Sequence, residues 1–234
     1  NDGMQDQLWI NRGGNVFIDE ALLYGCSVDN TGKMKGSMGV ELADIDNDQD
    51  LDLYVTTLFR ETDSFFINRE GTMLDSTARW GLAADTRTFT GWAIIACDFN
   101  NDGEEDLYET TGRVRWQADQ YDENDWLAEP NLLFMQKNNR FTLVEPIGGT
   151  EQPLIYSAHG AAVGDLNLDG LVDIVVVNKD ASLNVLQNVL ELEDTGNWIK
   201  FDIRNQFGSP ALGAKVEITL VDGRKIYKQV RSSS

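Results

Sequence analysis

Positive charge, histidine, cysteine and long apolar runs are all scarce in this sequence of 234 residues. It has 19 Lys and Arg against 39 Asp and Glu, which gives a formal net charge of −20. Nucleic acid and anionic membranes are therefore not expected as partners, because both are negatively charged themselves. No apolar run approaches the roughly 18 residues of a membrane-spanning helix, so membrane insertion is not expected either.

The few cysteines and the single histidine restrict the chemistry further. The sequence leaves open whether its two cysteines, Cys26 and Cys97, form a disulfide. The one histidine, His159, stands where equivalent segments carry Met38 and Trp92, so an apolar packing position fits better than a catalytic base. No Ser or Cys nucleophile lies in a recognisable setting, and there is no phosphate-binding glycine loop. The sequence therefore predicts no catalytic residue.

What the sequence has in excess is acid, much of it in three copies of one nine-residue pattern. The pattern is D-x-[DN]-x-D-G-x-x-D, and its copies occupy residues 44–52, 98–106 and 165–173. Gln49 is the one departure, since it stands where the other two copies have glycine. Each copy lies between a small or apolar run and a strand-like run. Three copies in one frame argue against a merely solvated acidic turn.

The spacing of these acids indicates a site for a hard cation. Side chains at the first, third, fifth and ninth positions can turn their oxygens to one centre, and the seventh-position carbonyl can add another. Calcium takes six to eight oxygen ligands in flexible geometry, whereas magnesium favours strict octahedral sites and keeps its waters. Zinc fits less well, because the loops hold no Cys or His. The pattern therefore predicts about three Ca²⁺ sites.

The three predicted sites are not equal. The first has four candidate carboxylates, while the second and third each have three carboxylates and a neutral asparagine. The candidates are Asp44, Asp46, Asp48 and Asp52; Asp98, Asn100, Asp102 and Asp106; and Asp165, Asn167, Asp169 and Asp173. Glycine at the sixth position tolerates positive φ, whereas Gln49 there costs on the order of 1 kcal/mol. Whether the extra charge or the missing glycine dominates at the first site stays open.

The second copy also satisfies the EF-hand pattern, with Glu109 at the twelfth position. The other two copies have Val55 and Val176 there, and all three have Asp at the ninth position. The residues that follow alternate or run apolar like strands and show no helical period. Glu109 is therefore interpreted as a chance match, and dockerin-type repeats are set aside because they too need a following helix.

Short strand-like segments recur between the acidic loops. They lie at residues 7–12, 64–69, 131–136 and 182–187, and the first three are followed by a turn and further strands at 16–18, 73–74 and 141–144. Four short strands per roughly 50 residues are typical of a β-propeller blade. The predicted fold is all-β, with about three blades in residues 1–190. Residues 7–12 align with the third strand of a blade, so the chain is expected to begin inside one, with earlier blades missing.

An insertion at residues 113–130 lengthens the second repeat. It carries Trp116, Tyr121 and Trp126 among several acids. Exposed aromatic side chains on a loop can form a platform for a sugar or a protein. The alternative is an ordered loop whose aromatics cap the blade. The three aromatics are thus weak candidates for ligand binding.

The last part of the chain changes character. Residues 191–197 are predicted to be a polar linker. Residues 198–234 hold seven Lys and Arg against three Asp and Glu, a net of +4 that leaves −24 on the first 197 residues. Such a break suggests a domain boundary. Alternation over 198–204 and 216–220, with a turn at Asp222-Gly223, predicts a small β module that is expected to be C-terminally incomplete.

Three local features give the chain a family resemblance. They are Gly39–Asp44 with Asp52–Val55, Pro130–Phe134 with Arg140-Phe141, and Asn197-Trp198 with Gly213–Val216. The acidic loops resemble FG-GAP/VCBS repeats, the calcium-bearing blades of integrin-α-like propellers. The whole is most similar to the ASPIC/UnbV, or cartilage acidic protein-like, group. This resemblance implies a calcium-stabilised propeller outside the cytoplasm, with further ligands at the carbonyls of Asp50, Glu104 and Leu171.

The resemblance implies adhesion or interaction rather than a particular reaction. The leading hypothesis is a secreted, cell-surface or periplasmic module that binds a protein or glycan, with structural calcium. One alternative is the propeller part of a carbohydrate-active enzyme similar to polysaccharide lyases. Another is an accessory subunit of a larger extracytoplasmic complex, in which the acidic propeller would dock on a basic partner.

Overall fold

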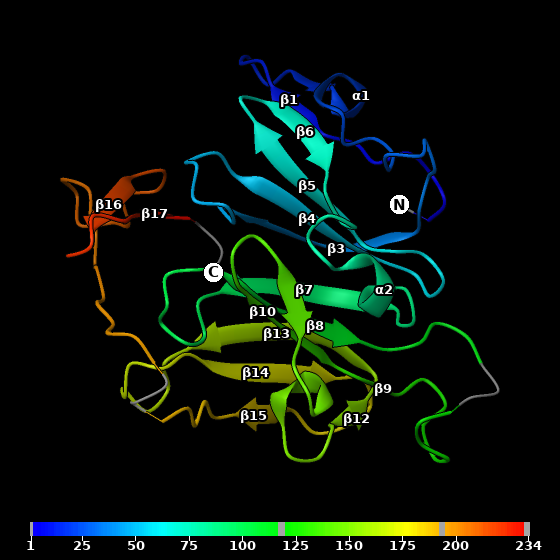
Figure 1. Cartoon of the computed structure of the whole chain (residues 1–234). Coiled ribbons are helices and arrows are strands. Elements are labelled where there is room, and N and C mark those ends of the chain that lie inside the picture. Colours follow the sequence, from blue (N-terminus) through cyan, green and yellow to red (C-terminus); the bar gives the residue numbers. More distant parts are fainter. Residues whose placement is uncertain (1, 117–119, 192–194, 232–234) are drawn as a thin grey trace.

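Each acidic loop joins the first two strands of an antiparallel sheet (Figure 1). The computed structural model of the chain describes residues 2–116, 120–191 and 195–231. The first sheet has the order β3-β4-β5-β6, the second β7-β8-β10-β11, and the third β13-β14-β15. The first sheet consists of β3 (Ser37–Ala43), β4 (Asp52–Thr57), β5 (Ser64–Arg69) and β6 (Thr72–Asp75). The second consists of β7 (Gly91–Cys97), β8 (Asp106–Thr111), β10 (Leu132–Gln136) and β11 (Phe141–Leu143). The third consists of β13 (Ala158–Gly164), β14 (Asp173–Asn178) and β15 (Asn184–Leu186).

Three two-stranded pairs and short helical segments complete the described part of the chain. The pairs are β1 (Trp9–Asn11) with β2 (Phe17–Asp19), β9 (Glu129–Pro130) with β12 (Ile155–Tyr156), and β16 (Lys215–Thr219) with β17 (Lys225–Gln229). The helical segments are α1 (Ala21–Tyr24), α2 (Ala83–Thr86) and a 3-10 turn at Ile147–Gly149. The all-β prediction is therefore confirmed.

The sheets pack face to face because their strands carry apolar side chains on both faces. In β8, Leu107 points into a layer shared with the first sheet and Tyr108 into a layer shared with the third. This is the strand alternation expected when both faces are buried. The first layer is rich in aromatics, with Phe65 in edge contact with Trp80 (5.2 Å between ring centroids) and Phe141 (6.0 Å).

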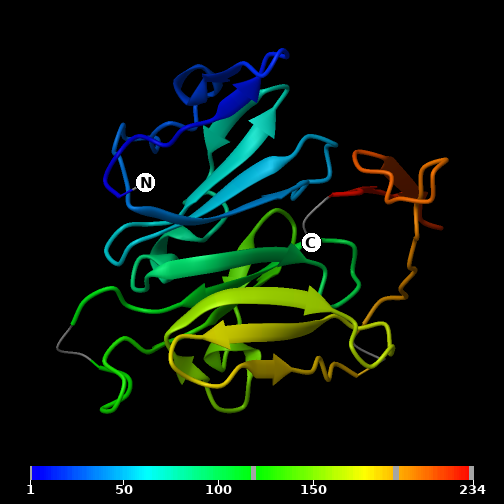
Figure 2. The ribbon, with the colours of Figure 1, turned by 180° about the vertical axis from the view of Figure 1, so that it is seen from behind.

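The first strands of the three sheets lie next to one another, with β7 between β3 and β13. Figure 2 shows the same stack from behind, with the three sheets one above another. This stacking is compatible with the predicted propeller blades, which stay a prediction. The pair β1–β2 lies beyond β6 (Figure 1).

Each first strand contains a β-bulge near its beginning. The register shifts lie between Ser37 and Val40, between Gly91 and Ile94, and between Ala158 and Gly160. A bulge changes the direction of the side chain within it, and the His159 ring there packs at a tilt against Trp92, with 4.1 Å between ring centroids. The expected packing contact of His159 is therefore present, but the side chain is exposed rather than buried.

Two further expectations are decided by the structure. Cys26 and Cys97 are both free thiols. Cys26 packs beside Phe66, and Cys97 lies against the layer shared by the second and third sheets. The strand predicted at residues 198–204 is wrong: only Arg204 forms a bridge, with Pro210, because no partner strand lies beside the rest of the segment. The predicted hairpin around Asp222-Gly223 is confirmed as β16–β17.

Candidate metal centre

The first-position aspartates of the three loops make the same two hydrogen bonds. Each carboxylate accepts from the backbone amides of the fifth and sixth residues of its own loop. The distances are 2.9 and 2.9 Å at Asp44, 3.0 and 2.8 Å at Asp98, and 3.1 and 3.1 Å at Asp165. The three loops are therefore one structural unit used three times, as the shared pattern predicts.

Two residues in each loop adopt positive φ. At the sixth position φ is 79° for Gln49, 92° for Gly103 and 89° for Gly170, so the predicted strain at Gln49 is confirmed. The fourth position is also left-handed, with φ of 60° at Asn47, 58° at Asn101 and 63° at Leu168. The left-handed conformation could have been predicted from the two asparagines, since Asn tolerates it better than most residues. It could not have been predicted from Leu168, which is exposed.

The fifth-position aspartate holds the loop closed and keeps a second oxygen for another donor. Its Oδ1 accepts the amide of the seventh residue, at 2.9 Å for Asp48, 2.8 Å for Asp102 and 2.9 Å for Asp169. In the second and third loops its Oδ2 accepts from the third-position amide, Asn100 at 3.1 Å and Asn167 at 2.7 Å. In the first loop the third residue is an aspartate and cannot donate.

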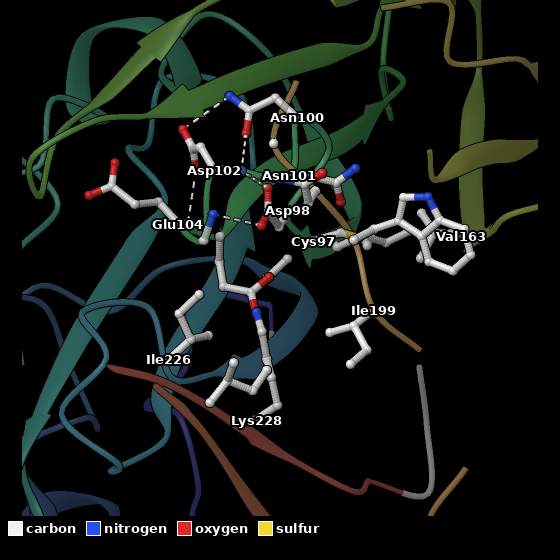
Figure 3. Close-up of a pocket in the computed structure, with 18 of the residues that line it drawn as sticks. Cys97, Asp98, Asn100, Asn101, Asp102, Glu104, Val163, Ile199, Ile226 and Lys228 are labelled. Atoms are coloured by element: carbon white, nitrogen blue, oxygen red, sulfur yellow. Dashed lines mark hydrogen bonds and ion pairs between the residues drawn. The ribbon is translucent and has the colours of Figure 1, made fainter. Parts of the chain in front are cut away.

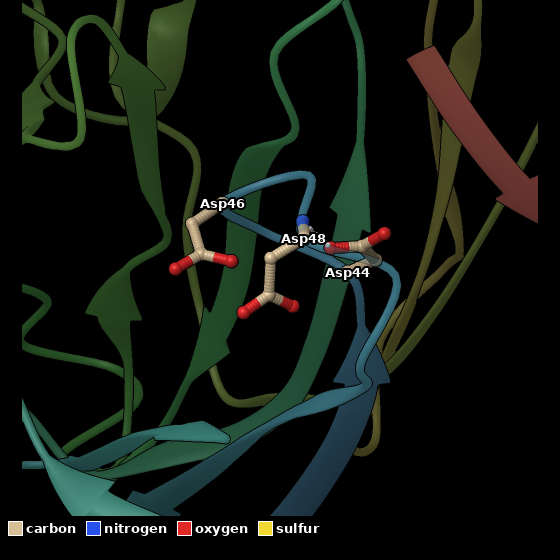
Figure 4. A group of neighbouring side chains, drawn as sticks. All are labelled: Asp44, Asp46 and Asp48. Atoms are coloured by element: carbon tan, nitrogen blue, oxygen red, sulfur yellow. Dashed lines mark hydrogen bonds between the residues drawn. The ribbon is translucent and has the colours of Figure 1, made fainter. Parts of the chain in front are cut away.

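The carboxylates of the first loop fit a calcium ion. Asp44, Asp46 and Asp48 each offer an oxygen, and these oxygens lie within 4.8 Å of one another (Figure 4). Calcium–oxygen distances of about 2.3–2.6 Å allow two ligand oxygens to be about 5 Å apart at most. Moreover, Asp46 Oδ1 is buried and has no hydrogen-bond partner. Buried carboxylate oxygens nearly always accept a hydrogen bond, so one without a donor is the expected state of a metal ligand when the ion is absent.

Burial of the first-position carboxyls also favours a cation. Removal from water raises the pKa of Asp44 and of Asp98, and neighbouring acids in each loop raise it further. A bound divalent ion would reverse this effect, because opposite charge stabilises the ionised form. The donor set of all three loops consists of oxygens, which suits calcium.

The ninth-position aspartates, Asp52, Asp106 and Asp173, are buried and tie each loop to its sheet. Each accepts the amide of the second loop residue and an amide at the end of the third strand. The distances are 2.9 and 2.8 Å at Asp52, 3.1 and 2.8 Å at Asp106, and 2.9 and 2.9 Å at Asp173. Burial raises the pKa of Asp52 to about 7 and that of Asp106 to about 8. Each oxygen keeps a second lone pair, so their role as ligands stays a prediction.

Residues 44–109 match the family of FG-GAP-like repeats. The matched segment covers the first two acidic loops. The chain is also 27% identical over 227 residues to Cartilage acidic protein 1 of Xenopus tropicalis, an alignment that covers 92% of this chain. It covers 32% of that protein, so the chain spans about a third of the length of this relative. These findings support the repeat family; the C-terminal ASPIC/UnbV-like module and its limits at 198–234 stay predictions.

The seventh-position residues of the FG-GAP-like segment have side-chain contacts that sequence reasoning missed. Asp50 accepts the amide of Glu70 at 3.0 Å, and Glu104 accepts that of Asn138 at 3.3 Å, so both acids cap the turn between the third and fourth strands. Leu171, in the third loop, is buried instead. The predicted ligand role of the three seventh-position carbonyls is not tested by these contacts and stays a prediction.

Amide side chains near the end of the third strand link one repeat to the next. Gln136 Nε2 donates to the carbonyl of Ile45 at 3.2 Å, and Asn188 Nδ2 donates to that of Phe99 at 2.8 Å. Both acceptors are second-position residues of the preceding acidic loop. Loop geometry and sheet packing are thus connected, and an ion that fixes a loop also fixes the contact to the next sheet.

The C-terminal hairpin lies against the acidic loops of the FG-GAP-like segment (Figure 1). The amide side chain of Asn47 accepts from Tyr227 N at 2.8 Å and donates to the carbonyl of Lys225. Lys228 pairs with Glu105, and Arg231 with Glu41 at 2.7 Å. The opposite charges of the two parts, seen in the sequence, therefore meet at this contact.

A cavity of about 1140 Å³ lies between the second acidic loop, the first strands β7 and β13, and the C-terminal residues (Figure 3). Asp98 and Asp102 line one wall, and Ile199, Ile226 and Lys228 line another. A Cβ at position 103 would lie 2.8 Å from Ile226, and one at position 170 would lie 1.8 Å from the Trp198 indole. A side chain at position 170 would therefore require the Trp198 indole to move, whereas at position 103 only the end of the Ile226 side chain would have to shift.

The insertion at 113–130 lies at the other end of the sheets (Figure 1). Its Tyr121 stacks on Phe89 with 6.3 Å between ring centroids, and the Arg113 guanidinium lies 5.1 Å from the Tyr121 ring. Trp116, Tyr121 and Trp126 are 64%, 47% and 43% exposed. Tyr121 packs against Phe89 and is also accessible to solvent, so the capping and the platform alternatives both stay open; residues 117–119, like 192–194 of the predicted linker, lie outside the described part of the chain.

Proposed function

We propose that this chain is part of a calcium-stabilised β-propeller that acts outside the cytoplasm as an interaction module for a protein or glycan. The observation that carries the proposal is the buried, unpartnered Asp46 Oδ1 within a carboxylate group of ligand spacing. Two more loops repeat the same hydrogen-bonded geometry with an asparagine in place of Asp46. The similarity of residues 44–109 to FG-GAP-like repeats supports the same conclusion.

Calcium in this proposal is structural. When bound, it would neutralise the clustered carboxylates at the first, fifth and ninth positions of each loop, and that of Asp46 at the third position of the first loop. Because the second-position carbonyls of the first two loops accept hydrogen bonds from the next sheet, a fixed loop also holds neighbouring sheets together. Sites of modest affinity suit the millimolar calcium of extracellular fluids. No helix of the described residues is long and apolar enough to span a membrane.

The proposed ligand surface is the end of the sheets opposite the acidic loops, where Trp116 and Trp126 are exposed. A non-catalytic role is favoured by where the remaining acids lie. Asp63, Glu109 and Glu129 form the main acidic group away from the loops, and they are at most 1% exposed, so no substrate can reach them. The calcium loops, for their part, have each first- and fifth-position carboxylate committed to backbone amides.

Thermal unfolding with calcium and with a chelator, together with metal analysis, tests the proposal. We expect about one calcium per acidic loop and a melting temperature that falls by many degrees on chelation. Asp102→Asn should lower the melting temperature more in calcium than in chelator, because it removes a proposed calcium ligand as well as the hydrogen bond from Asn100. Asp106→Asn should cost on the order of 1–3 kcal/mol in both conditions, because it leaves a buried amide without its acceptor. A melting temperature indifferent to the chelator, with no metal bound, would exclude the calcium sites.

A further inference from the structure

The first acidic loop has a cation of its own. Arg69, the last residue of β5, places NH1 2.5 Å from Asp48 Oδ2 and NH2 2.5 Å from Asp46 Oδ2. One guanidinium therefore bridges the third- and fifth-position carboxylates. A planar guanidinium presents donors in a rigid fork that can serve two carboxylates at once, whereas a lysine ammonium is a single point charge.

The second and third loops achieve the same result without an arginine. There the third-position asparagine donates to the fifth-position Oδ2, from Asn100 to Asp102 and from Asn167 to Asp169. The Oδ2 atom of the fifth-position aspartate thus accepts a hydrogen bond in every loop. Only in the first loop does the donor come from another strand, because Asp46 has no hydrogen to give.

We propose that Asp46 and Arg69 together replace the asparagine of the other loops, and that Arg69 is a positioning residue for the calcium ligands of the first loop. This inference rests on the proposed calcium-binding function. The charges agree with it: Asp46 adds one negative charge to the loop and Arg69 removes one. The four carboxylates of the first site with Arg69 then carry the same net charge as the three carboxylates of each other site.

The geometry shows how Arg69 would support binding rather than compete with it. It engages the Oδ2 atoms of Asp46 and Asp48, while Asp46 Oδ1 stays buried and without a partner. The Asp46 side chain is 5% exposed and that of Arg69 is 49% exposed. The arginine is therefore on the solvent side of the two carboxylates. It holds their Oδ2 atoms and leaves Asp46 Oδ1 for the ion. Outer partners of this kind orient ligands and tune metal affinity.

Calcium titration followed by NMR can read each loop separately. The amides of Gln49, Gly103 and Gly170 each donate to the first aspartate of their own loop, so each reports one site. We expect Arg69→Gln to raise the calcium midpoint at Gln49 by about 10- to 100-fold, the usual effect of losing such a partner. The midpoints at Gly103 and Gly170 should not change, which makes them internal controls.

A double variant gives the sharper test. Asp46→Asn alone should weaken the first loop, because it leaves the Arg69 charge without its counterpart. Asp46→Asn with Arg69→Gln recreates the arrangement of the other loops, so its midpoint at Gln49 should return to within about threefold of the unmodified protein. Arg12→Gln is the matched control: Arg12 follows Ile-Asn in an equivalent strand but pairs with Glu20, and it should move none of the three midpoints.

The outcomes separate this inference from the proposed function. If none of the three amides responds to calcium, the calcium sites themselves are excluded and the inference with them. If Gly103 and Gly170 respond but Arg69→Gln leaves the Gln49 midpoint unchanged, or lowers it, Arg69 is not a positioning residue. Additive losses in the double variant would likewise overturn the pairing of Asp46 with Arg69.

Discussion

At the scale of single residues, the fourth position of each acidic loop shows how one backbone conformation is served by unequal side chains. All three residues there have φ near 60°, and two of them are asparagine, which tolerates this region better than most residues. Leu168 is the exception. Its side chain is 76% exposed, so packing of the leucine contributes little to offset the energetic cost of the strained backbone.

Leu168→Asn should therefore stabilise the protein by on the order of 0.5–1 kcal/mol, since it relieves part of the cost of a left-handed leucine. Chemical denaturation at saturating calcium measures the change. Leu166→Asn is the control, because this neighbour is also exposed, at 58%, but does not have positive φ. A gain of equal size in both variants would show that replacing an exposed apolar side chain with a polar one, and not relief of backbone strain, stabilises the protein.

At the scale of secondary-structure elements, the first two sheets enclose a pair of carboxyl groups. Glu109 on β8 lies near Asp63, which accepts from Tyr54 Oη at 2.9 Å and from Thr57 N at 2.8 Å. Burial raises the pKa of Glu109 well above its usual range, and the Asp63 charge raises it further. Asp63 has hydrogen-bond donors, whereas both carboxyl oxygens of Glu109 are buried without a partner, so Glu109 is the group expected to hold a proton. The remaining acid facing Glu109 is Glu129, which pairs with Arg113 at 3.1 Å.

This pair predicts a pH dependence of stability. Above about pH 4.3, the unfolded chain releases a proton that folded Glu109 keeps, so the contribution of Glu109 to stability declines as pH rises. Glu109→Gln removes the titrating proton and keeps a side chain of nearly the same size. At constant saturating calcium, this variant should gain stability relative to the unmodified protein between pH 5 and 8, by at most about 1.4 kcal/mol per pH unit.

Equilibrium unfolding at several pH values measures this gain. Asp63→Asn is the comparison, since it removes an acceptor used by Tyr54 and Thr57 and should destabilise the protein at every pH. Parallel pH profiles for Glu109→Gln and the unmodified protein would show that Glu109 does not hold a proton in the folded state.

The contact between the first acidic loop and β17 is a second element-scale feature. Asn47 contacts a residue far away in the chain, since Lys225 follows it by 178 positions. Asn47→Gly keeps the backbone freedom that φ of 60° requires but removes both hydrogen bonds to the hairpin. Hydrogen exchange at the Tyr227 amide should become about tenfold faster, the equivalent of about 1.4 kcal/mol.

Asn101→Gly is the matched control for this exchange experiment. Asn101 has the same loop position, but its amide donates to the carbonyl of Gly170 at 3.2 Å instead of the hairpin. Exchange at Tyr227 should therefore be unaffected by this change. Equal acceleration in both variants would mean that general loosening of the loops, and not the Asn47 contact, exposes the hairpin.

At the scale of the whole molecule, the net charge of −20 opposes the compact state. Three bound calcium ions would cancel six of these charges. Salt should therefore stabilise the calcium-free protein more than the calcium-loaded protein, because raising the ionic strength from 0.15 to 1 M shortens the screening length from about 8 to about 3 Å.

Melting temperatures in sodium chloride, with calcium and with a chelator, check this prediction. We expect a rise of several degrees in the chelated protein and a smaller one in calcium. Comparing the two forms removes the general effect of salt on burial, which both share. An equal rise in both forms would show that repulsion among the acidic loops does not limit stability.

The repeated unit could be predicted from the order of the residues alone. The three nine-residue patterns predict loops of one geometry, because the same turn and acidic residues recur at the same positions, and the flanking runs predict the strands β3, β4, β7, β8, β13 and β14. The strain at Gln49 and the hairpin at β16–β17 were also readable, because turn chemistry is local.

The surroundings of these loops could not be predicted from the sequence, because they depend on contacts between distant residues. Arg69 reaches Asp46 across 23 positions, and Asn47 reaches β17 across 178, and neither pairing has a local signature. The same holds for the segment 198–204, whose alternation looks like a strand but finds no partner. The residues of a loop specify its conformation and its oxygen atoms. The charges and contacts around the loop depend on which strands pack next to it. That stacking is set by burial of the apolar faces shared between sheets.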